Sequence, residues 1–497
     1  MISNEENIIE TFQKKIILFR QIYDLLQWDQ VTYMPEKGID SRSVQLGLIK
    51  STIHELLVDD TLFDSINKVI STTKDQDYKD SLNKFLEEIN YERKLPLDFI
   101  QDYFKEVSLS IDTWKIAKDK NDFKLFLPHL KKIIDLNIKK SRYLDNSSHP
   151  YDPILKEFDK ELSVEKLKNL FNRLKPELYK ILNNIRATKL YNNPDKCRIY
   201  DTFDFDKLVL ITKDISSRMG LSNPSFRMDY SIHPFSKKIG IHDGRIAIMK
   251  RKDPISFISS YMHESGHILY DLGLPEKNSY KIIGQIPSLS LYESQSRLWE
   301  IMIGMNKSFW EFYYPKIKDI IKSDQNFEDF YFNINKMEGV CLRTYSDEIN
   351  YFLHIILRFE IECDLFEGKI NVEDLPYIWN KKSQEILGVT PINDSVGVLQ
   401  DIHWSAGLFG YFPTYAIGTI YAANIFQAMS KDIDINNKLK KGDYKEIKQW
   451  LTKNIFLKGN KNSSDIIKEI GLDPLDITGI INYLKNKFYP IYDVLEK

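Results

Sequence analysis

The chain has 497 residues with 69 basic and 71 acidic side chains, so its formal net charge is −2. This balance gives no electrostatic support to a nucleic-acid or membrane-surface role, because both kinds of partner select a basic face or tail. No apolar run approaches the roughly 18 residues of a membrane span, and residues 1–6 lack the pattern of a secretory signal. We therefore expect a cytoplasmic protein without nucleic-acid or membrane partners.

Helices are predicted over most of the chain. Glycine (20) and proline (18) are both scarce, which favours long helices over a turn-rich β architecture. No linker and no internal repeat interrupts the sequence, so we expect a single domain over residues 1–497. Clear helical segments are Asn4–Gln27, with a capping box between Ser3 and Glu6, and Ser163–Asn183, Asp347–Phe366 and Ile417–Met429.

The segment from Phe226 to Lys250 is the exception. Gly240, His242 and Gly244 interrupt β-prone pieces there, and we expect a small antiparallel sheet. The three cysteines, Cys197, Cys341 and Cys363, are too few and too scattered for a disulfide framework or a cysteine-ligated metal, so they are expected to be reduced thiols.

A helix of about five turns is predicted directly after this segment. Asp253 and Pro254 have the order of an N-cap and a first helical residue. Apolar side chains follow at helical spacing, and Gly273 then Pro275 indicate a left-handed C-cap and a stop.

This helix carries the sequence His263-Glu264-Ser265-Gly266-His267. Residues i and i+4 share one helix face, so both imidazoles can reach one metal ion, and Glu264 falls where a base that activates water would sit. The alternative is that two unrelated histidines lie on a packed helix.

A second helical stretch is predicted from Leu291 to Glu300, preceded by Pro287 and Ser288. Glu293 lies 26 residues after His267 (293 − 267). Catalytic zinc needs a third protein ligand and an open position, and two histidines plus a glutamate from another helix describe a gluzincin-type site. Glu293, Arg297 and Glu300 share one face, which alternatively forms a solvated charged stripe.

Beyond these two helices, the chain resembles the thermostable (Taq-type, M32) carboxypeptidase family of zinc metallopeptidases almost from end to end. The matching segments are Leu26–Gln30 with Met34–Pro35, Gly38, Arg42 and Gln45; His233–Phe235 with Asp243 and Arg245; His263–His267; Glu293–Glu300; Leu342–Thr344 with Asp347–Glu348; Leu353–Ile355; and Leu399–Ser405 with Gly407 and Phe409–Tyr415.

The resemblance implies a role for each matching position. His263, His267 and Glu293 correspond to the zinc ligands, and Glu264 corresponds to the general base and later proton donor. Arg343 corresponds to an arginine that holds the terminal carboxylate of a peptide, for which a planar guanidinium is suited. His403, Tyr411 and Tyr415 correspond to residues near the active site, where a donor could stabilise an oxyanion. The alternatives are a structural ion pair for Arg343 and an aromatic core for the tyrosines.

Two departures from the family pattern stand out. Tyr292 replaces the histidine that usually precedes the ligand glutamate, and residues 246–250 lack the polar Thr-Thr-Arg run of many members. The first changes a neighbour of the ligands, and such neighbours tune metal affinity.

We expect a mainly α-helical single domain with a deep active-site groove and a small antiparallel sheet beside the histidine-bearing helix. The resemblance implies one zinc ion per chain (with cobalt as a substitute), peptide substrates with a free C-terminus, and a homodimer. Release of single C-terminal residues is the expected activity. Two alternatives stay open: a helical zinc oligopeptidase that cleaves internal bonds, and a catalytically silent zinc-stabilised binding protein.

Overall fold

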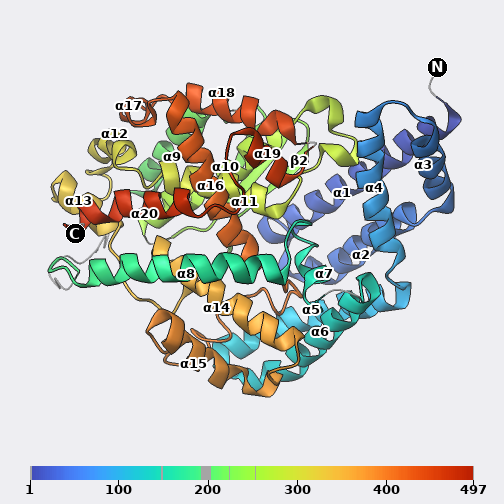
Figure 1. Cartoon of the computed structure of the whole chain (residues 1–497), viewed down its shortest axis with the longest axis horizontal. Coiled ribbons are helices and arrows are strands. Elements are labelled where there is room, and N and C mark those ends of the chain that lie inside the picture. Colours follow the sequence, from blue (N-terminus) through green and yellow to red (C-terminus); the bar gives the residue numbers. More distant parts are fainter. Residues whose placement is uncertain are drawn as a thin grey trace.

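The computed structural model describes residues 3–146, 149–191, 203–222, 224–251, 253–459 and 461–495. Four helices gather at one end of the molecule (Figure 1): α1 (Asn4–Thr32), α2 (Ile39–Leu57), α3 (Asp60–Thr72) and α4 (Gln76–Arg93). The next part of the chain forms α5 (Leu97–Lys120), α6 (Phe123–Leu144), α7 (Asp152–Leu155), α8 (Val164–Arg186) and α9 (Phe205–Met219). Cys197 lies outside the described residues, and Cys341 and Cys363 are free.

The second half of the chain is also mainly helical. It comprises α10 (Pro254–Gly273), α11 (Leu289–Arg297), the π-helical turn η4 (Leu298–Ile303), α12 (Lys307–Ile317), α13 (Phe327–Ile334), α14 (Glu348–Phe366), α15 (Leu375–Leu387), α16 (Phe412–Asp432), α17 (Ile435–Lys440), α18 (Lys445–Asn454), α19 (Ser463–Glu469) and α20 (Thr478–Ile491). The mainly helical prediction is confirmed, and no described helix is long and apolar enough to cross a membrane.

The first predicted helix starts where the sequence pattern predicts and ends later than predicted. Both bonds of the predicted capping box form: Glu6 N–H donates to Ser3 Oγ over 3.1 Å, and Ser3 N–H donates to Glu6 Oε2 over 2.7 Å. At the other end α1 continues five residues beyond Gln27. Trp28 lies in this extension, is almost fully buried, and packs on Phe235 with 4.9 Å between ring centroids.

The predicted sheet is present, but its strands do not all run antiparallel. β1 (Phe226–Tyr230), β2 (Phe235–Gly240) and β3 (Asp243–Ile248) lie in the order β1-β3-β2, with β2 antiparallel and β1 parallel to β3. The tight turn at 241–242 pairs β2 with β3 and leaves the other edge of β3 for β1. The four residues 231–234 can extend about 13 Å, enough to cross the roughly 10 Å of two strand spacings.

The sheet packs against α10, as predicted. A side chain at Gly244 of β3 would come within 2.6 Å of Ile268 and 3.0 Å of Leu272, so β3 lies directly on this helix. Tight backbone packing of this kind sets the position of the histidine-bearing helix relative to the sheet.

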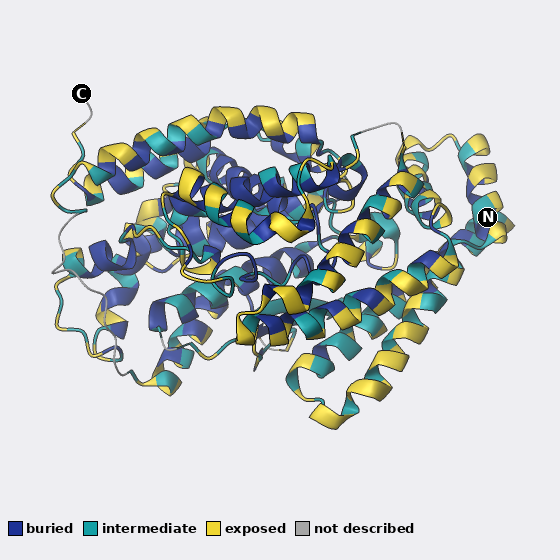
Figure 2. Cartoon of the chain, turned by 90° about the horizontal axis from the view of Figure 1, so that it is seen from below, coloured by how far each residue is buried: buried dark blue, intermediate teal, exposed yellow. Residues whose placement is uncertain are grey.

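Buried side chains form two main hydrophobic clusters in the described residues. The larger one extends from α5 to α20, and Figure 2 shows it as the buried centre beneath outer helix faces that are exposed. The smaller cluster joins α1, α2, α3 and α4 through residues such as Ile16, Leu57, Ile66 and Phe85. The single domain over residues 1–497 and the deep groove stay predictions.

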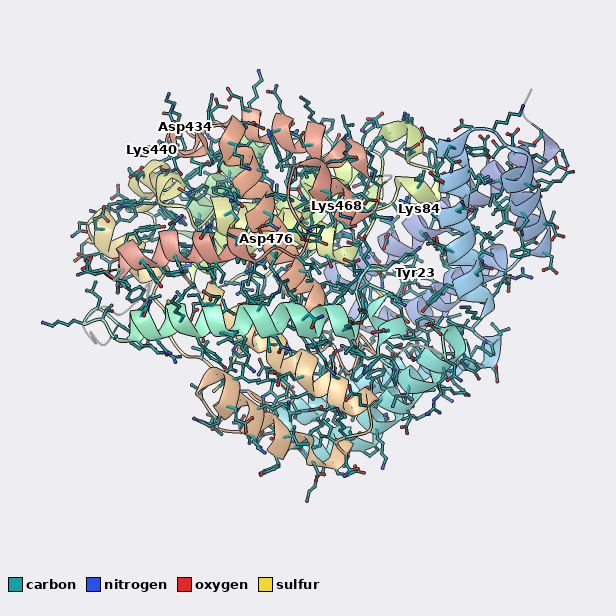
Figure 3. All side chains as sticks on the ribbon, in the orientation of Figure 1. Tyr23, Lys84, Asp434, Lys440, Lys468 and Asp476 are labelled. Carbon is teal, nitrogen blue, oxygen red and sulfur yellow. The ribbon has the colours of Figure 1, made fainter. Side chains whose placement is uncertain are left out.

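Two charged cavities lie at the periphery. One of about 1040 Å³ is lined by α12, α16, α17 and α20, and includes Asp434 and Lys440. The other, of about 570 Å³, includes Lys84 and Lys468. Figure 3 places these two pairs on different parts of the surface. Neither cavity includes the predicted metal ligands.

Candidate metal centre

The helix that carries both histidines begins as predicted and ends for a different reason. The carboxylate of Asp253 accepts from Ile255 N–H at 3.1 Å, and Pro254 occupies the first helical position. Gly273 is the last helical residue and not a left-handed cap. A side chain there would come within 2.4 Å of the Phe456 ring, so packing requires the glycine.

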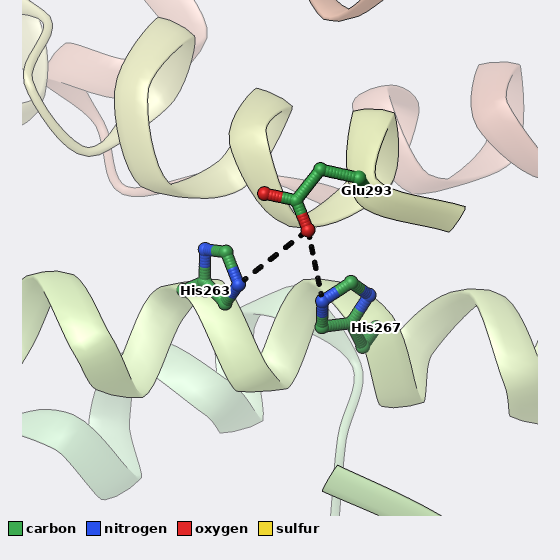
Figure 4. Close-up of side chains that lie close together, drawn as sticks. All are labelled: His263, His267 and Glu293. Carbon is green, nitrogen blue, oxygen red and sulfur yellow. Dashed lines mark ion pairs between the residues drawn. The ribbon is translucent and has the colours of Figure 1, made fainter. Parts of the chain in front are cut away.

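The three predicted ligands meet at one point (Figure 4). Glu293 Oε2 lies 3.8 Å from His263 Nε2 and 3.6 Å from His267 Nε2, and the three ligand atoms lie within 4.8 Å of one another. Ligands at about 2.0–2.2 Å from a tetrahedral zinc ion are separated by roughly 3.3–3.6 Å. Glu293 Oε1 is buried without a hydrogen-bond partner among the described residues. This donor set fits a zinc ion with little rearrangement.

Two glycines let the ligand helices approach. A side chain at Gly266 of α10 would come within 2.7 Å of the Gln295 carbonyl oxygen, so α10 and α11 pack backbone against backbone. A side chain at Gly418 of α16 would come within 2.7 Å of Glu293 Cβ. Helix α11 is therefore held between α10 and α16, which fixes the position of Glu293.

Two carboxylates, Glu293 and Glu300, lie next to His263. Its Nδ1 lies 2.8 Å from Glu300 Oε2, which also accepts from Arg297 Nη1 at 2.7 Å. Burial works against protonation of His263, but the charges of Glu293 and Glu300 outweigh it and raise the pKa of this histidine to about 9. The surroundings therefore favour a cation at this place.

Glu264, the predicted base, is buried with 6% of its surface exposed. The pKa of Tyr411 is raised chiefly by burial, then by the charges of Glu293, Tyr351 and Glu264. These effects indicate that Tyr411 lies near both the ligand glutamate and the predicted base.

Arg343 is held in a second buried cluster. Its Nε and Nη2 donate to Asp401 Oδ1 at 3.2 and 3.0 Å, and its Nη1 donates to the Tyr351 hydroxyl at 3.1 Å. Burial alone would lower the pKa of Arg343, but the charge of Asp401 raises it above its ordinary value. Arg358 also binds Asp401, through its other carboxylate oxygen. Two guanidinium groups thus share one carboxylate.

The two nearby histidines do not add charge to this cluster. Burial, together with the charge of Arg358, lowers the pKa of His354 to about 3. His403 also has a pKa of about 3, chiefly because of burial. Since both are neutral at pH 7, Asp401 with its two arginines keeps one surplus positive charge. His354 is fully buried, and its Nε2 lies 3.0 Å from the Val340 carbonyl oxygen, so it is a packed and hydrogen-bonded histidine.

Tyr351 connects the two clusters. The Arg297 guanidinium lies 4.7 Å from the centre of its ring, and its hydroxyl accepts from Arg343. A continuous path therefore runs from His263 through Glu300, Arg297 and Tyr351 to Arg343.

The three remaining predicted residues also come together. His403 Nε2 lies 3.2 Å from the Tyr415 hydroxyl, and the Tyr411 and Tyr415 ring centroids are 5.2 Å apart. The Arg343 guanidinium lies 5.0 Å from the Tyr415 ring. Tyr415 is one turn before Gly418 on α16, which places it beside the packing contact with Glu293.

Sequence reasoning gave no role to Tyr351, Asp401 or Arg358. Asp401 lies in the long matching segment Leu399–Ser405, so the family resemblance of that segment could have indicated a role for Asp401. No spacing rule connects Arg358 with Asp401 or Tyr351 with Arg343, because these contacts depend on how α14 packs against segments that are distant in the chain or on another element.

Comparisons with known proteins extend over nearly the whole chain. The family model described as carboxypeptidase Taq (M32) metallopeptidase matches residues 8–488. Carboxypeptidase 1 of Bacillus subtilis (strain 168) is 33% identical over 487 residues, which cover 96% of this chain and 97% of that protein. Thermostable carboxypeptidase 1 of Pyrococcus furiosus is 32% identical over 498 residues, covering 96% and 98%. The crystal structure of an M32 carboxypeptidase from Deinococcus radiodurans R1 is similar with a TM-score of 0.93 and 25% identity, covering 99% and 100% of the two chains.

Proposed function

The chain belongs to the carboxypeptidase Taq (M32) family of metallopeptidases and is a metallocarboxypeptidase, and on this basis we propose that it holds one zinc ion through His263, His267 and Glu293. The observation that carries the proposal is the convergence of these three ligand atoms within 4.8 Å of one another. Cobalt is the proposed substitute ion, because it accepts the same nitrogen and oxygen ligands.

Glu264 is the proposed general base. A zinc ion held by His263, His267 and Glu293 would act as a Lewis acid, polarising a carbonyl and lowering the pKa of bound water to about 7. Glu264 follows the ligand His263 in the helix, and its carboxylate takes the proton of the attacking water and returns it to the leaving amine.

Arg343 is the proposed anchor for the terminal carboxylate of the peptide. Asp401 binds the Nε and Nη2 groups of Arg343. Arg343, Arg358 and Asp401 together carry one surplus positive charge, which a bound carboxylate neutralises. A single anchored carboxylate limits cleavage to the last peptide bond, which supports release of single C-terminal residues over internal cleavage.

Tyr411, Tyr415 and His403 are the proposed substrate-binding side chains beside this anchor. Their hydroxyl and imidazole groups are suited to donate to the carbonyl oxygen as it gains negative charge. Burial raises the pKa of both tyrosines, so each hydroxyl keeps its proton at pH 7.

The substrates we propose are peptides with a free C-terminus. A homodimer, a cytoplasmic location and a single domain over residues 1–497 are part of the same proposal, and they rest on the family resemblance and on composition.

Digestion of an unmodified peptide followed by mass spectrometry tests the proposed activity. We expect a ladder of products that shorten from the C-terminus by one residue, and loss of this ladder after treatment with a chelator. Zinc added back should restore it. Internal fragments would instead support an oligopeptidase, and an uncut peptide would support a silent binding protein.

A further inference from the structure

The two ligand histidines are supported in different ways. His263 has a carboxylate partner, Glu300, at its Nδ1. The Nδ1 of His267 is buried and has no hydrogen-bond partner among the described residues. A metal-ligating histidine ordinarily donates this N–H to a carboxylate, a carbonyl or water, which fixes the ring orientation. Among the described residues, the contact that can orient His267 is therefore of another kind.

That contact is the ring of Tyr292. It stacks on the His267 imidazole, with 4.0 Å between centroids and 22° between planes. Tyr292 immediately precedes the ligand Glu293 on α11, so its backbone is fixed by the same helix that presents the third ligand.

The far end of the Tyr292 side chain is fixed as well. Its hydroxyl donates to Asp271 Oδ2 at 2.8 Å. Asp271 lies four residues after His267 on α10, so it belongs to the same helix face. It is almost fully buried, and its backbone carbonyl accepts from Lys238 Nζ of β2 at 2.7 Å. Tyr292 therefore spans from α11 to α10 directly beside the imidazole.

We propose that Tyr292 is a positioning residue for the metal centre: its stacked ring holds His267 in the ligating orientation, and its bond to Asp271 holds the ring. The inference rests on the proposed metal site. Stacking restrains rotation of the imidazole as a hydrogen bond does, but the tyrosine ring accepts no hydrogen bond from Nδ1. The two histidines are consequently unequal ligands, and the orientation of His267 depends on an aromatic side chain.

Three variants separate the two parts of this arrangement. Tyr292→Leu removes the stacked ring, and Tyr292→Phe keeps the ring but removes the bond to Asp271. Tyr261→Leu is the matched control. It removes a buried tyrosine from α10, the helix of both histidines, and the hydroxyl of this tyrosine bonds to Ser216 and not to a neighbour of the ligands.

Metal affinity and ligand geometry are the measurements. Metal-free proteins are titrated with Zn²⁺ against a competing chelator, and the visible absorption spectrum is recorded with Co²⁺. We expect Tyr292→Leu to weaken Zn²⁺ binding by roughly 10- to 100-fold and to change the Co²⁺ spectrum. Tyr292→Phe should weaken binding several-fold and retain the spectrum. Tyr261→Leu should lower the melting temperature without changing either measurement.

The outcomes that overturn the proposal are specific. Wild-type affinity and spectrum in Tyr292→Leu would show that the stack does not orient His267. If that variant does not fold, unchanged affinity in Tyr292→Phe would still refute the role of the Asp271 bond. Failure of the wild-type protein to bind Zn²⁺ or Co²⁺ would instead refute the metal site itself.

Discussion

Glu264 is the side chain on which the proposed chemistry depends most directly. Its carboxylate does not belong to the converging ligand set, so Glu264→Gln should retain bound zinc. The amide cannot accept the proton of water, and we expect kcat to fall by roughly 10²- to 10⁴-fold. Metal analysis and steady-state kinetics check this. Full metal content with undiminished turnover would contradict the assignment of the base.

The Arg343 guanidinium is expected to recognise one end of the substrate. Removing one partner of a buried charge pair costs about 2–5 kcal/mol, so Arg343→Ala should lower kcat/KM by at least roughly 30-fold for peptides with a free C-terminus. Peptides with an amidated C-terminus are the control, since they offer no carboxylate to this arginine. An equal loss for both kinds of peptide would argue against the anchor.

At the scale of helices, the close contact of α16 with α11 sets the position of the third ligand. In Gly418→Ala, the added methyl group would lie 2.7 Å from Glu293 Cβ and 2.8 Å from Cγ, so one helix must move. Overpacking of this kind costs about 1–3 kcal/mol, and we expect weaker Zn²⁺ binding in a competition titration.

Gly47→Ala is the control for this substitution. Gly47 lies inside α2, and a side chain there meets nothing within 4 Å. Alanine should stabilise this helix by up to about 1 kcal/mol and leave metal affinity unchanged. Wild-type metal affinity in Gly418→Ala would show that α11 does not depend on this contact.

Helix α14 also organises the loop that carries His403 and Tyr411. Glu362 accepts from Trp404 Nε1 at 2.6 Å and from Gly410 N–H at 3.0 Å, and it bonds to the Tyr151 hydroxyl. Burial raises the pKa of Glu362 to about 7, although these donors and Arg358 act in the opposite direction.

This buried carboxyl group should make stability depend on pH. Between the ordinary pKa of about 4.3 and about 7 the folded state binds more protons than the unfolded state, so the free energy of unfolding falls as pH rises through this window. The total effect is on the order of 3 kcal/mol. Glu362→Gln should flatten the slope in denaturant unfolding measured at pH 5, 6, 7 and 8. A slope identical to that of the wild type would contradict the prediction.

For the whole molecule, metal binding tests whether the chain unfolds as one unit. The ligands lie on α10 and α11 within the larger hydrophobic cluster, whereas α1 to α4 share a smaller one. Zinc at 1,000 times its Kd should add about 4 kcal/mol to the stability of every part that unfolds with the site. If the chain is a single domain, calorimetry should show one transition that moves entirely when the metal is removed.

Two variants serve as controls for this experiment. Glu264→Gln keeps all three ligands and should show the wild-type shift, whereas His267→Ala loses a ligand and should show a much smaller one. A second transition that stays fixed during metal removal would assign α1 to α4 to a separate folding unit and overturn the single domain.

The sequence by itself determined the features that depend on neighbouring residues. The i, i+4 spacing put His263 and His267 on one face, and the caps at Ser3 and Asp253 formed as predicted, because such interactions close within one or two helical turns. The spacing also offered Glu293 as a third ligand on a second helix, and the resemblance added the role of Arg343. Contacts between segments far apart in the chain could not be predicted from the sequence.

Only the tertiary structure decided how those features combine. Gly273 is required by the close approach of Phe456 and is not the predicted left-handed cap. Strand β1 pairs in parallel with β3, and not antiparallel as predicted. The stack of Tyr292 on His267 requires α10 and α11 to pack at one distance and one angle. Local propensity carries no information about such distances, since they follow from the simultaneous packing of several helices around the metal ligands.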